Sequence, residues 1–544
     1  MANLHIIDWI IISFYLITMI GLSGWISFSL GSKKDYFVTR DGVSPGALAV
    51  SIIATQCSTN SILGAPAFVA FAAGGGLIWL QYELALPIAM LISSVIFMPI
   101  IFNLKIISVY EYLDFRFGSK TKLLLSGIFL LSRSAATAVL IFGVASVIQL
   151  IAGLNFFWAV MLFGLVTVVY DLLGGIKAVI YSDIVQMIIL CAVLGISLYL
   201  LTAASGGIAE MFASVSQDRV EAINFSSHGL GDGEDFAFWP MFFGGIFLYV
   251  SYYMCDQSQV QRGLCARSQS DAQKILVLNG VLRFPFVFLY CLIGVGLANY
   301  AADNAGFFEQ LSVNGKDPNF NLAVPVFFLN ELPMGMLGLS LVALLAAAMS
   351  SLDSVINSLS AVSMEDFVKS TSWGKTLTDQ QELWLCRCFT IIWGGVAVSG
   401  SFWVGDIAST VIVAVNKIGS VTNGPVLAVF VIGLLSRKTT GISAVLGFFV
   451  GIFVNITLWQ LAPNVSWLWW NVFGFAGAFL TALLIARLMP QRKFVGESDK
   501  ILFWSWIRYK KLLGGKAPKF SYYFLTFYTG ILIAFLAFFN SAVN

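Results

Sequence analysis

The chain has 544 residues, of which 58% are hydrophobic and only 11% are charged. Soluble domains carry about 25% charged residues, so this composition excludes a soluble globular protein and predicts an all-α membrane protein with many spans. The formal net charge of +2 does not identify a partner, because the distribution of charge along a membrane protein matters more than its sum.

Fourteen stretches are apolar over about 20 residues or more, which is long enough for a helix to cross a membrane. The first of them lacks the basic segment and small-residue cleavage site of a signal peptide, so we expect it to be a retained span. The stretches cover residues 5–28, 46–73, 77–103, 122–152, 156–176, 183–204, 237–261, 274–301, 332–363, 384–404, 411–436, 440–461, 465–487 and 519–541.

The basic residues predict the orientation of these spans. Lysines and arginines follow every odd-numbered stretch, for example Arg262 and Lys274 after the seventh, whereas the intervening loops hold almost none beyond Arg219 and Lys316. Loops rich in basic residues stay in the cytoplasm, so both termini are predicted to lie outside. The short loops are typical of an integral protein of a bacterial inner membrane, and a eukaryotic plasma membrane is the alternative.

Several classes of protein are excluded by what the sequence lacks. The seven cysteines are an odd number and lie mostly in apolar stretches, which argues against a disulfide framework. The two histidines leave almost no material for a histidine metal site or a catalytic triad. No GxxxxGK[ST] loop is present. We therefore expect neither an enzyme nor an ATP-driven transporter.

Two of the predicted spans contain polar and small residues in their interior. Residues 51–68 read SIIATQCSTNSILGAPAF, and residues 249–262 read YVSYYMCDQSQVQR. Helices interrupted at membrane depth free backbone carbonyls to bind ions. The alternatives are a helix-packing face in the first span and an interfacial aromatic belt in the second. The two spans are the second and the seventh, which is the separation expected of two inverted five-helix repeats.

The ninth stretch, 332–363, carries a polar face. A membrane carboxylate costs several kcal/mol unless it is paired or binds a cation, and hard cations prefer oxygen ligands. We therefore predict a sodium site here. The alternative is that the serines bond to carbonyls of their own helix while the carboxylate pairs with Lys or Arg. The face comprises, at spacings i, i+3, i+4, i+7 and i+8, Ser350, Asp353, Ser354, Asn357 and Ser358.

Other charged residues lie within or close to predicted spans. Glu83 is a carboxylate in the third span and is a functional candidate by default. Arg283 lies in the middle of the eighth span, where it either pairs with an acid or binds a substrate carboxylate or hydroxyl. Asp183 begins the sixth span and could instead be hydrated or cap a helix. Arg133 could extend its side chain to the membrane surface.

Four collinear motifs carry a resemblance to a known family. They are GGIKAVIYSDIVQ (174–186), DQSQVQR (256–262), AAAMSSLDSVINS (346–358) and GPVLAVFVIGL (424–434). In order and spacing, from about residue 8 to residue 440, the chain resembles the sodium/solute symporter family, which includes sodium–glucose, sialic acid, proline, iodide and monocarboxylate cotransporters.

The resemblance implies the LeuT-type fold and a division of the chain. Residues 1–45 would hold an extra first transmembrane helix and a cytoplasmic loop. Two inverted five-helix repeats, 46–204 and 237–436, would flank an outer loop at 205–236. Three further transmembrane helices would occupy 437–544.

The resemblance also implies two sodium sites. The general site would use the carbonyls of Ala54, Cys57 and Ala347 and the hydroxyls of Ser350 and Ser351. A second site, found in members similar to the sialic acid transporters, would use Asp183, Ser350, Asp353 and Ser354. Those members have serine in place of Asp353, so the extra charge here should strengthen cation binding or admit a proton.

The sugar-transporting members imply a substrate site that is only partly retained here. Their sugar-binding glutamate matches Glu83 and their gating tyrosine matches Tyr252. Their lysine falls on Arg283, and two glutamines fall on Asn416 and Ser61. Gln81, close to Glu83, completes our set of candidates. The carboxylate-binding arginine of the sialic acid group does not align with Arg133.

We therefore expect a sodium-coupled symporter that imports a small polar solute, such as a sugar, a polyol or a sugar acid, by alternating access. Its partners would be that solute, sodium ions and membrane lipid, and no nucleic acid. A symporter of a small monocarboxylate or other anion is the alternative within this class. A solute sensor built on a transporter is the alternative from another class, although no regulatory domain is evident.

Overall fold

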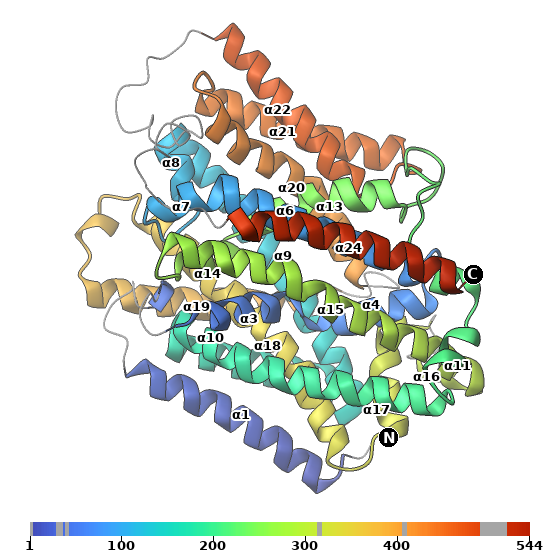
Figure 1. The fold of residues 1–544 in the computed structure, drawn as a ribbon. Helices are drawn as coiled ribbons and strands as arrows, with labels where there is room; N and C mark the ends of the chain where they lie inside the picture. The colour runs from blue at the N-terminus through green and yellow to red at the C-terminus, as the bar shows by residue number, and fades with distance from the viewer. Residues whose placement is uncertain are drawn as a thin grey trace.

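The computed structural model describes residues 4–28, 36–38, 43–312, 318–404, 411–489 and 519–543. No β-strand forms within these residues, and the chain folds into a bundle of long helices that run in roughly the same direction (Figure 1). The prediction of an all-α membrane protein is confirmed. Both termini lie at the same end of the bundle (Figure 1).

The first half of the chain contains α1 to α12. Their bounds are α1 Ile6–Ser27, α3 Pro45–Gln56, α4 Thr59–Phe71, η1 Leu77–Trp79, α5 Leu80–Glu83, α6 Ala85–Ile92, η2 Ser93–Phe97, α7 Met98–Asn103, α8 Glu111–Phe117, α9 Ser119–Ala152, α10 Phe156–Ala204, α11 Ile208–Ala213 and α12 Gln217–Val220.

The second half begins at η3 and ends at α24. The bounds are η3 Pro240–Gly244, α13 Gly245–Cys255, α14 Gln257–Leu264, α15 Gln269–Asp303, α16 Phe307–Gln310, η4 Phe320–Leu322, α17 Ala323–Glu331, α18 Met336–Val362, η5 Ser363–Val368, η6 Gly374–Thr376, α19 Asp379–Ser401, α20 Val411–Leu435, α21 Gly441–Leu461, α22 Trp469–Leu488 and α24 Lys519–Val543.

Both spans that the sequence predicts to be interrupted are broken. α3 and α4 meet at an angle of 57°, where Ser58 adopts an extended conformation between them. The second break lies at Asp256, whose backbone is also extended (φ −101°, ψ 120°). The Asp256 side chain accepts a hydrogen bond from the amide of Ser258 and so caps α14. A short polar residue in extended conformation therefore marks each break, and at the second break its side chain also caps the following helix.

The longest helix, α10, changes direction at Gly175. Its 49 residues would extend about 74 Å as one straight helix, more than twice the thickness of a membrane core of about 30 Å. Gly175 has φ +54° and ψ −162°, a conformation that strongly favours glycine. A Cβ at this position would lie 2.7 Å from the carbonyl oxygen of Tyr36. α10 therefore comprises two membrane spans.

The predicted number of spans agrees with this structure. Within the described residues, 11 helices are long and apolar enough to cross a membrane, α3 and α4 together form one bent span, and Pro240–Cys255 is a shorter apolar helix. When the two halves of α10 are counted separately, these helices correspond to the fourteen predicted spans.

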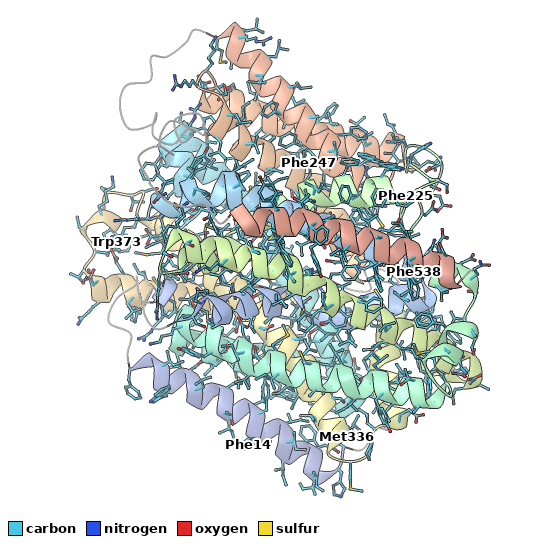
Figure 2. The ribbon with its side chains drawn as sticks, viewed as in Figure 1. Phe14, Phe225, Phe247, Met336, Trp373 and Phe538 are labelled. Atoms are coloured by element: carbon cyan, nitrogen blue, oxygen red, sulfur yellow. The ribbon has the colours of Figure 1, made fainter. Side chains whose placement is uncertain are left out.

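α18 forms the centre of the bundle and α1 lies at its edge. In the most apolar part of the segment formed by α18 and η5, 89% of the residues are buried, against 28% for α1. Figure 1 shows α18 crossing the bundle close to α3 and α10, and these three helices contact one another. On α1 only one stripe is buried, whereas Phe14 points away from the bundle (Figure 2). α18 is thus one of the helices that pack against the broken span α3–α4, together with α10 and α15.

The first helix is fixed to the start of α18 by a single carboxylate. Asp8 is buried, and its Oδ1 atom accepts hydrogen bonds of 2.7 Å from the amides of both Gly335 and Gly338. These amides belong to the first turn of α18, where helix amides have no partner in their own helix. Gly338 permits the close approach, because a Cβ there would lie 2.6 Å from Cα of Asp8.

Candidate cation and substrate sites

Two serines of α18 face the end of α3. The Ser350 hydroxyl lies 3.0 Å from the carbonyl oxygen of Ala54 and 3.1 Å from that of Ala347. The Ser351 hydroxyl lies 2.9 Å from the carbonyl oxygen of Thr55 and 3.2 Å from that of Ala347. The serines therefore bond to carbonyls of their own helix, as the alternative hypothesis predicted. They also bond to the carbonyls beside the break in the second span.

This arrangement suits a small monovalent cation. Four of the five predicted residues of the general site, Ala54, Ala347, Ser350 and Ser351, come together, while Cys57 ends the same turn of α3. Thr55 contributes a carbonyl that the sequence did not suggest. All the candidate ligand atoms are neutral oxygens, and hard cations prefer oxygen ligands. The described part of the chain has no group of three His, Cys, Asp or Glu side chains arranged to hold a metal ion.

Asp353 lies on the same helix and is completely buried. Tyr170 donates a hydrogen bond to its Oδ2 atom. The hydroxyl of Ser354 lies 3.1 Å from its Oδ1 atom and 2.6 Å from the carbonyl oxygen of Ser350. Three of the four residues predicted for the second site, Ser350, Asp353 and Ser354, therefore form one continuous polar patch.

Asp183, the fourth residue of that site, is also completely buried. The alternative of a hydrated or helix-capping carboxylate at the membrane edge is therefore wrong. Its Oδ2 atom accepts a hydrogen bond of 2.5 Å from the Ser51 hydroxyl and lies 3.5 Å from the Arg262 guanidinium. Arg262 also donates to the hydroxyl of Ser354. The guanidinium thus lies between the two parts of the predicted second site.

Asp171 is a further buried carboxylate that the sequence analysis missed. It is fully enclosed, and neither of its carboxylate oxygens has a hydrogen-bond partner within the described residues. Its neighbour Tyr170 is the residue that donates to Asp353. The signal that could have found it is an acid in the apolar stretch 156–176, which is as unusual there as Glu83 is in the third span.

Glu83 and Arg283 form a buried ion pair. Nε of Arg283 lies 3.0 Å from Oε2 of Glu83, and Tyr249 donates a 2.9 Å hydrogen bond to Oε1. The same guanidinium donates to Oε1 of Gln56 at 2.7 Å. The sequence left two roles open for Arg283, pairing with an acid or binding a substrate, and the structure shows the pairing with an acid.

A chain of polar contacts continues from this pair to the second broken span. Nε2 of Gln56 lies 3.5 Å from Oε1 of Gln259, and Gln259 donates to the Tyr252 hydroxyl at 2.9 Å. The guanidinium of Arg133 lies 5.0 Å from the centre of the Tyr252 ring and forms an ion pair with Asp256. Arg133 therefore pairs with the acid that caps α14. These contacts connect both helix breaks.

The remaining substrate candidates differ in position. Ser61 donates a 3.0 Å hydrogen bond to the carbonyl of Gln56 and so adjoins the chain of contacts. Gln81 instead contacts the outer loop. Its side-chain oxygen accepts a 2.7 Å hydrogen bond from the backbone amide of Asn224, and its side-chain nitrogen donates to the carbonyl of Phe236 at 3.0 Å. Asn416 lies in the first turns of α20, where its carbonyl accepts from Ser420.

A polar cavity adjoins the second break. It lies between α9, α13 and α20, with Tyr252 and Asp256 in its wall. The residues around it are Tyr110, Leu125, Ile128, Phe129, Ser132, Ser251, Tyr252, Cys255, Asp256, Thr422, Asn423 and Val426. Several polar groups in its wall already have partners in the protein, since Ser251 donates to the carbonyl of Asn423 and Asp256 pairs with Arg133.

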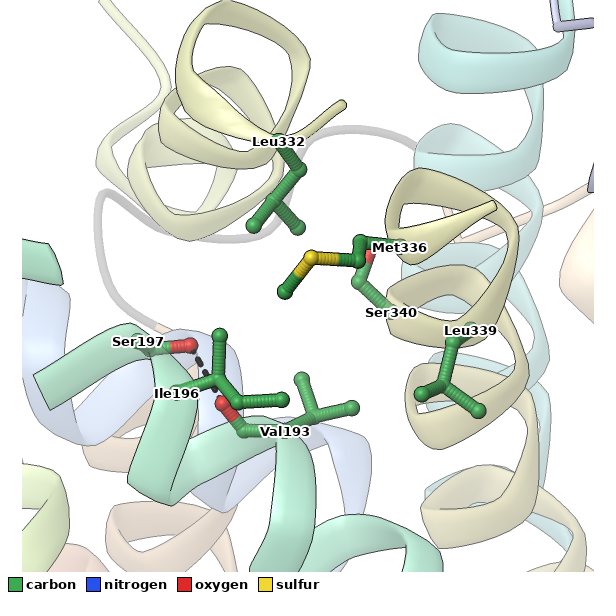
Figure 3. A pocket seen from close by; sticks show the side chains of 7 residues that line it. All are labelled: Val193, Ile196, Ser197, Leu332, Met336, Leu339 and Ser340. Atoms are coloured by element: carbon green, nitrogen blue, oxygen red, sulfur yellow. Dashed lines mark hydrogen bonds between the residues drawn. The ribbon is translucent and has the colours of Figure 1, made fainter. Parts of the chain in front are cut away.

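A second crevice is unsuited to a polar solute. Figure 3 shows it between the second half of α10 and the start of α18, with Leu332 and Met336 in its wall. Its two serines, Ser197 and Ser340, donate to carbonyls of their own helices at 2.7 Å. The remaining side chains in its wall are apolar.

Comparison with known proteins gives consistent matches. Residues 36–451 match the model of the sodium:solute symporter family. The chain is 27% identical to a putative sodium-dependent multivitamin transporter of Drosophila melanogaster, over 83% of this chain and 74% of that protein. It is 26% identical to human sodium-coupled monocarboxylate transporter 1, over 83% and 72%. It is 25% identical to the sodium/sialic acid symporter of Proteus mirabilis (strain HI4320), over 91% and 97%.

Two solved structures share the fold. One is a Na+-coupled sialic acid symporter in a substrate-bound outward-open state, with a TM-score of 0.80, 24% identity, and 90% of this chain and 99% of that chain covered. The other is Mhp1, a nucleobase-cation-symport-1 family transporter, with a TM-score of 0.55, 14% identity and coverage of 86% and 98%. The predicted LeuT-type fold is confirmed.

Proposed function

The chain belongs to the sodium:solute symporter family, and from this premise we propose that it imports a small polar organic solute together with sodium. The family consists of transporters, so the protein is not an enzyme, and sodium is the coupling ion. The solute that we favour is a sugar, a polyol or a sugar acid. It would bind near the middle of the membrane, between the two helix breaks.

The observation that carries the sodium part of this proposal is the contact between α18 and the end of α3. We assign the general sodium site to the carbonyls of Ala54, Cys57 and Ala347 and the hydroxyls of Ser350 and Ser351. Sodium bound there would join the broken span to α18, because its ligands come from both helices. A solute that requires this arrangement would bind more tightly when sodium is present, and sodium would bind more tightly with the solute.

A second sodium site remains part of the proposal, with Asp183, Ser350, Asp353 and Ser354 as its ligands. The two buried carboxylates favour a cation, because an uncompensated charge inside the membrane is costly. Each positive charge that moves inward gains about 2.3 kcal/mol per 100 mV of membrane potential. Two sodium ions would therefore raise the attainable concentration of solute well above what one ion allows.

The polar contacts from Glu83 to Tyr252 support a solute with hydroxyl groups. Both buried arginines nearby already face a carboxylate: Arg283 faces Glu83 and Arg133 faces Asp256. A carboxylate solute would have to replace one of these acids, whereas a hydroxyl can donate to Glu83 or accept from Arg283 with both left in place. Ser61 and Asn416 are further candidates for solute contacts, and Tyr252 is the candidate inner gate. Gln81 is the least favoured candidate for a solute contact, since its side chain is bonded to the outer loop.

The two breaks support the predicted organisation of the chain. We divide it into an extra first helix with its loop (1–45), inverted repeats at 46–204 and 237–436 around the loop 205–236, and three further spans in 437–544. The protein is an integral membrane protein with many spans. The basic loops favour a plasma membrane, in bacteria the inner membrane, with both termini outside.

Uptake by the purified protein in liposomes tests the function. Radiolabelled sugars, polyols, uronates and monocarboxylates would be supplied with an inward gradient of sodium or, as the control, potassium. We expect accumulation of a sugar, polyol or sugar acid only with sodium. Accumulation of a monocarboxylate alone would favour the alternative substrate class. Equal uptake in potassium would contradict sodium coupling.

A further inference from the structure

We propose that Arg262 is an internal cation that occupies the second cation site in competition with sodium. The inference rests on the proposed function in one respect only, namely that sodium reaches this site. The sequence predicts Arg262 in a cytoplasmic loop, whereas its side chain is completely buried in the structure. A buried arginine with no access to water has to be neutralised by acids close to it.

The guanidinium of Arg262 uses the oxygens that the second sodium site requires. Its Nη2 atom donates to the Ser354 hydroxyl and lies 3.5 Å from Oδ2 of Asp183. Its Nε atom donates to the Ser51 hydroxyl at 2.7 Å, and that hydroxyl donates to Asp183. Asp183 and Ser354 are two of the four proposed sodium ligands. A sodium ion on both would therefore lie within a few ångströms of the guanidinium.

Two positive charges at that separation repel strongly in a medium from which water is excluded. The site therefore does not fit sodium while Arg262 occupies it. The acids nevertheless need a positive charge, since Asp183 and Asp353 are both buried close to Arg262 and Asp171 is a further buried carboxylate close to Asp353. Arg262 and sodium are thus alternative counter-charges for the same acids.

One contact of Arg262 lies within its own helix and does not involve the proposed sodium ligands. Its Nη1 atom donates to the carbonyl of Ser258 in its own helix, α14, at 2.6 Å. The contacts with Ser51 on α3 and Ser354 on α18 are those that sodium would displace. When they are lost, α14 is held less firmly against α3 and α18. Sodium in the second site would therefore loosen α14, a helix that directly follows the break at Asp256.

Direct measurement of sodium binding tests this competition without the need for a solute. The full-length protein in detergent would be titrated with sodium chloride at constant ionic strength with choline, and binding followed by calorimetry. In Arg262→Gln the shape and most hydrogen-bonding capacity of the side chain remain but the charge is lost. We expect its sodium dissociation constant for the weaker site to fall at least tenfold.

A second variant keeps every charge and addresses the case in which Arg262→Gln fails to fold. Ser51→Ala removes one contact of the guanidinium with the site, so it should release Arg262 more easily and lower the same dissociation constant about threefold. Arg116→Gln is the matched control, because Arg116 is a buried arginine that bonds to the carbonyl of Gly433, away from the acids. It should leave sodium binding unchanged.

Unchanged or weaker sodium binding in Arg262→Gln would overturn the competition, and so would unchanged or weaker binding in Ser51→Ala. Either result with intact sodium-driven uptake in the unmodified protein overturns this inference alone. An unmodified protein that neither binds sodium nor uses it for uptake overturns the proposed function as well. The binding measurement and the uptake measurement therefore separate the two failures.

Discussion

Ser351 of α18 donates a hydrogen bond to the carbonyl of Thr55 at the end of α3, across a distance of 2.9 Å and a sequence separation of 296 residues. Thr55 lies in the last turn of α3, which ends at Gln56, and the carbonyls of a last helical turn have no amide partner within their own helix. The contact joins the broken span to the central helix through the groups proposed to bind sodium.

Removal of the Ser351 hydroxyl should weaken the general sodium site. In Ser351→Ala one of the five proposed ligands is lost, and we expect the sodium concentration for half-maximal thermal stabilisation to rise at least tenfold. Ser360→Ala is the matched control, because this buried serine lies on the same helix but bonds to the carbonyl of Cys386 at 2.7 Å. Equal sodium dependence of the two variants would contradict the assignment of Ser351.

Loss of the Asp353 charge should remove cooperativity between sodium ions. The unmodified protein is expected to show a Hill coefficient near two for sodium-driven uptake, as two coupled sites require. In Asp353→Asn and Asp353→Ala the second site loses a charged ligand, so the coefficient should approach one. Initial uptake rates over a range of sodium concentrations measure it. A coefficient of one in the unmodified protein would eliminate the second site.

The ion pair of Glu83 and Arg283 predicts a strongly non-additive pair of substitutions. Arg283→Gln leaves a buried carboxylate without its counter-charge, which should destabilise the protein by about 3–5 kcal/mol. Glu83→Gln should have a similar effect, and the double variant should recover most of the loss. Stability would be measured by denaturation in detergent. Additive losses would show that the two side chains do not act as a pair.

Gly175 should not tolerate a side chain, although it lies in the middle of a long apolar segment. Gly175→Ala places a Cβ 2.7 Å from the carbonyl oxygen of Tyr36 at a residue with φ +54° and ψ −162°, and this backbone conformation alone costs a residue with a side chain about 1–3 kcal/mol. Gly195→Ala in the same helix is the control, because a Cβ there meets nothing within 4 Å. The midpoint of thermal unfolding should fall for the first variant and stay level or rise for the second.

Asp8→Ala should loosen the start of α18. Loss of a capping carboxylate typically costs about 0.5–2 kcal/mol, and here it also leaves two buried amides without partners. Asp8→Asn retains an acceptor and should be less affected. Limited proteolysis and thermal unfolding of both variants would measure the difference. Identical behaviour of all three proteins would mean that the contact with Gly335 and Gly338 contributes nothing.

The sequence predicted features that depend on local pattern. Polar and small residues around Cys57 and Asp256 indicated two breaks, because such residues are unusual at membrane depth, and both breaks are present. The helical period of α18 placed Ser350, Asp353 and Ser354 on one face, and their contacts confirm that face. Patterns of this kind need no knowledge of distant partners.

Features that depend on long-range pairing were beyond such reasoning. Arg262 follows a predicted span and therefore resembled the other basic residues of the cytoplasmic loops, whereas it is buried against Asp183. The sequence could not distinguish these outcomes, because they depend on which helix faces α14. Asp171 could have been found as an acid in an apolar stretch, but its proximity to Asp353 depends on the packing of α10 against α18 and cannot be read from the sequence.

The carboxylate of Asp8 has a consequence for how the protein is made. Its two partners on α18 follow it by 327 and 330 residues in the chain. At a synthesis rate of about 5–20 residues per second, α1 has to wait roughly 15–65 seconds for them after it enters the membrane. During that time Asp8 needs water or another protein as a substitute, so the first helix is expected to settle in its final place only after the ninth span has been inserted.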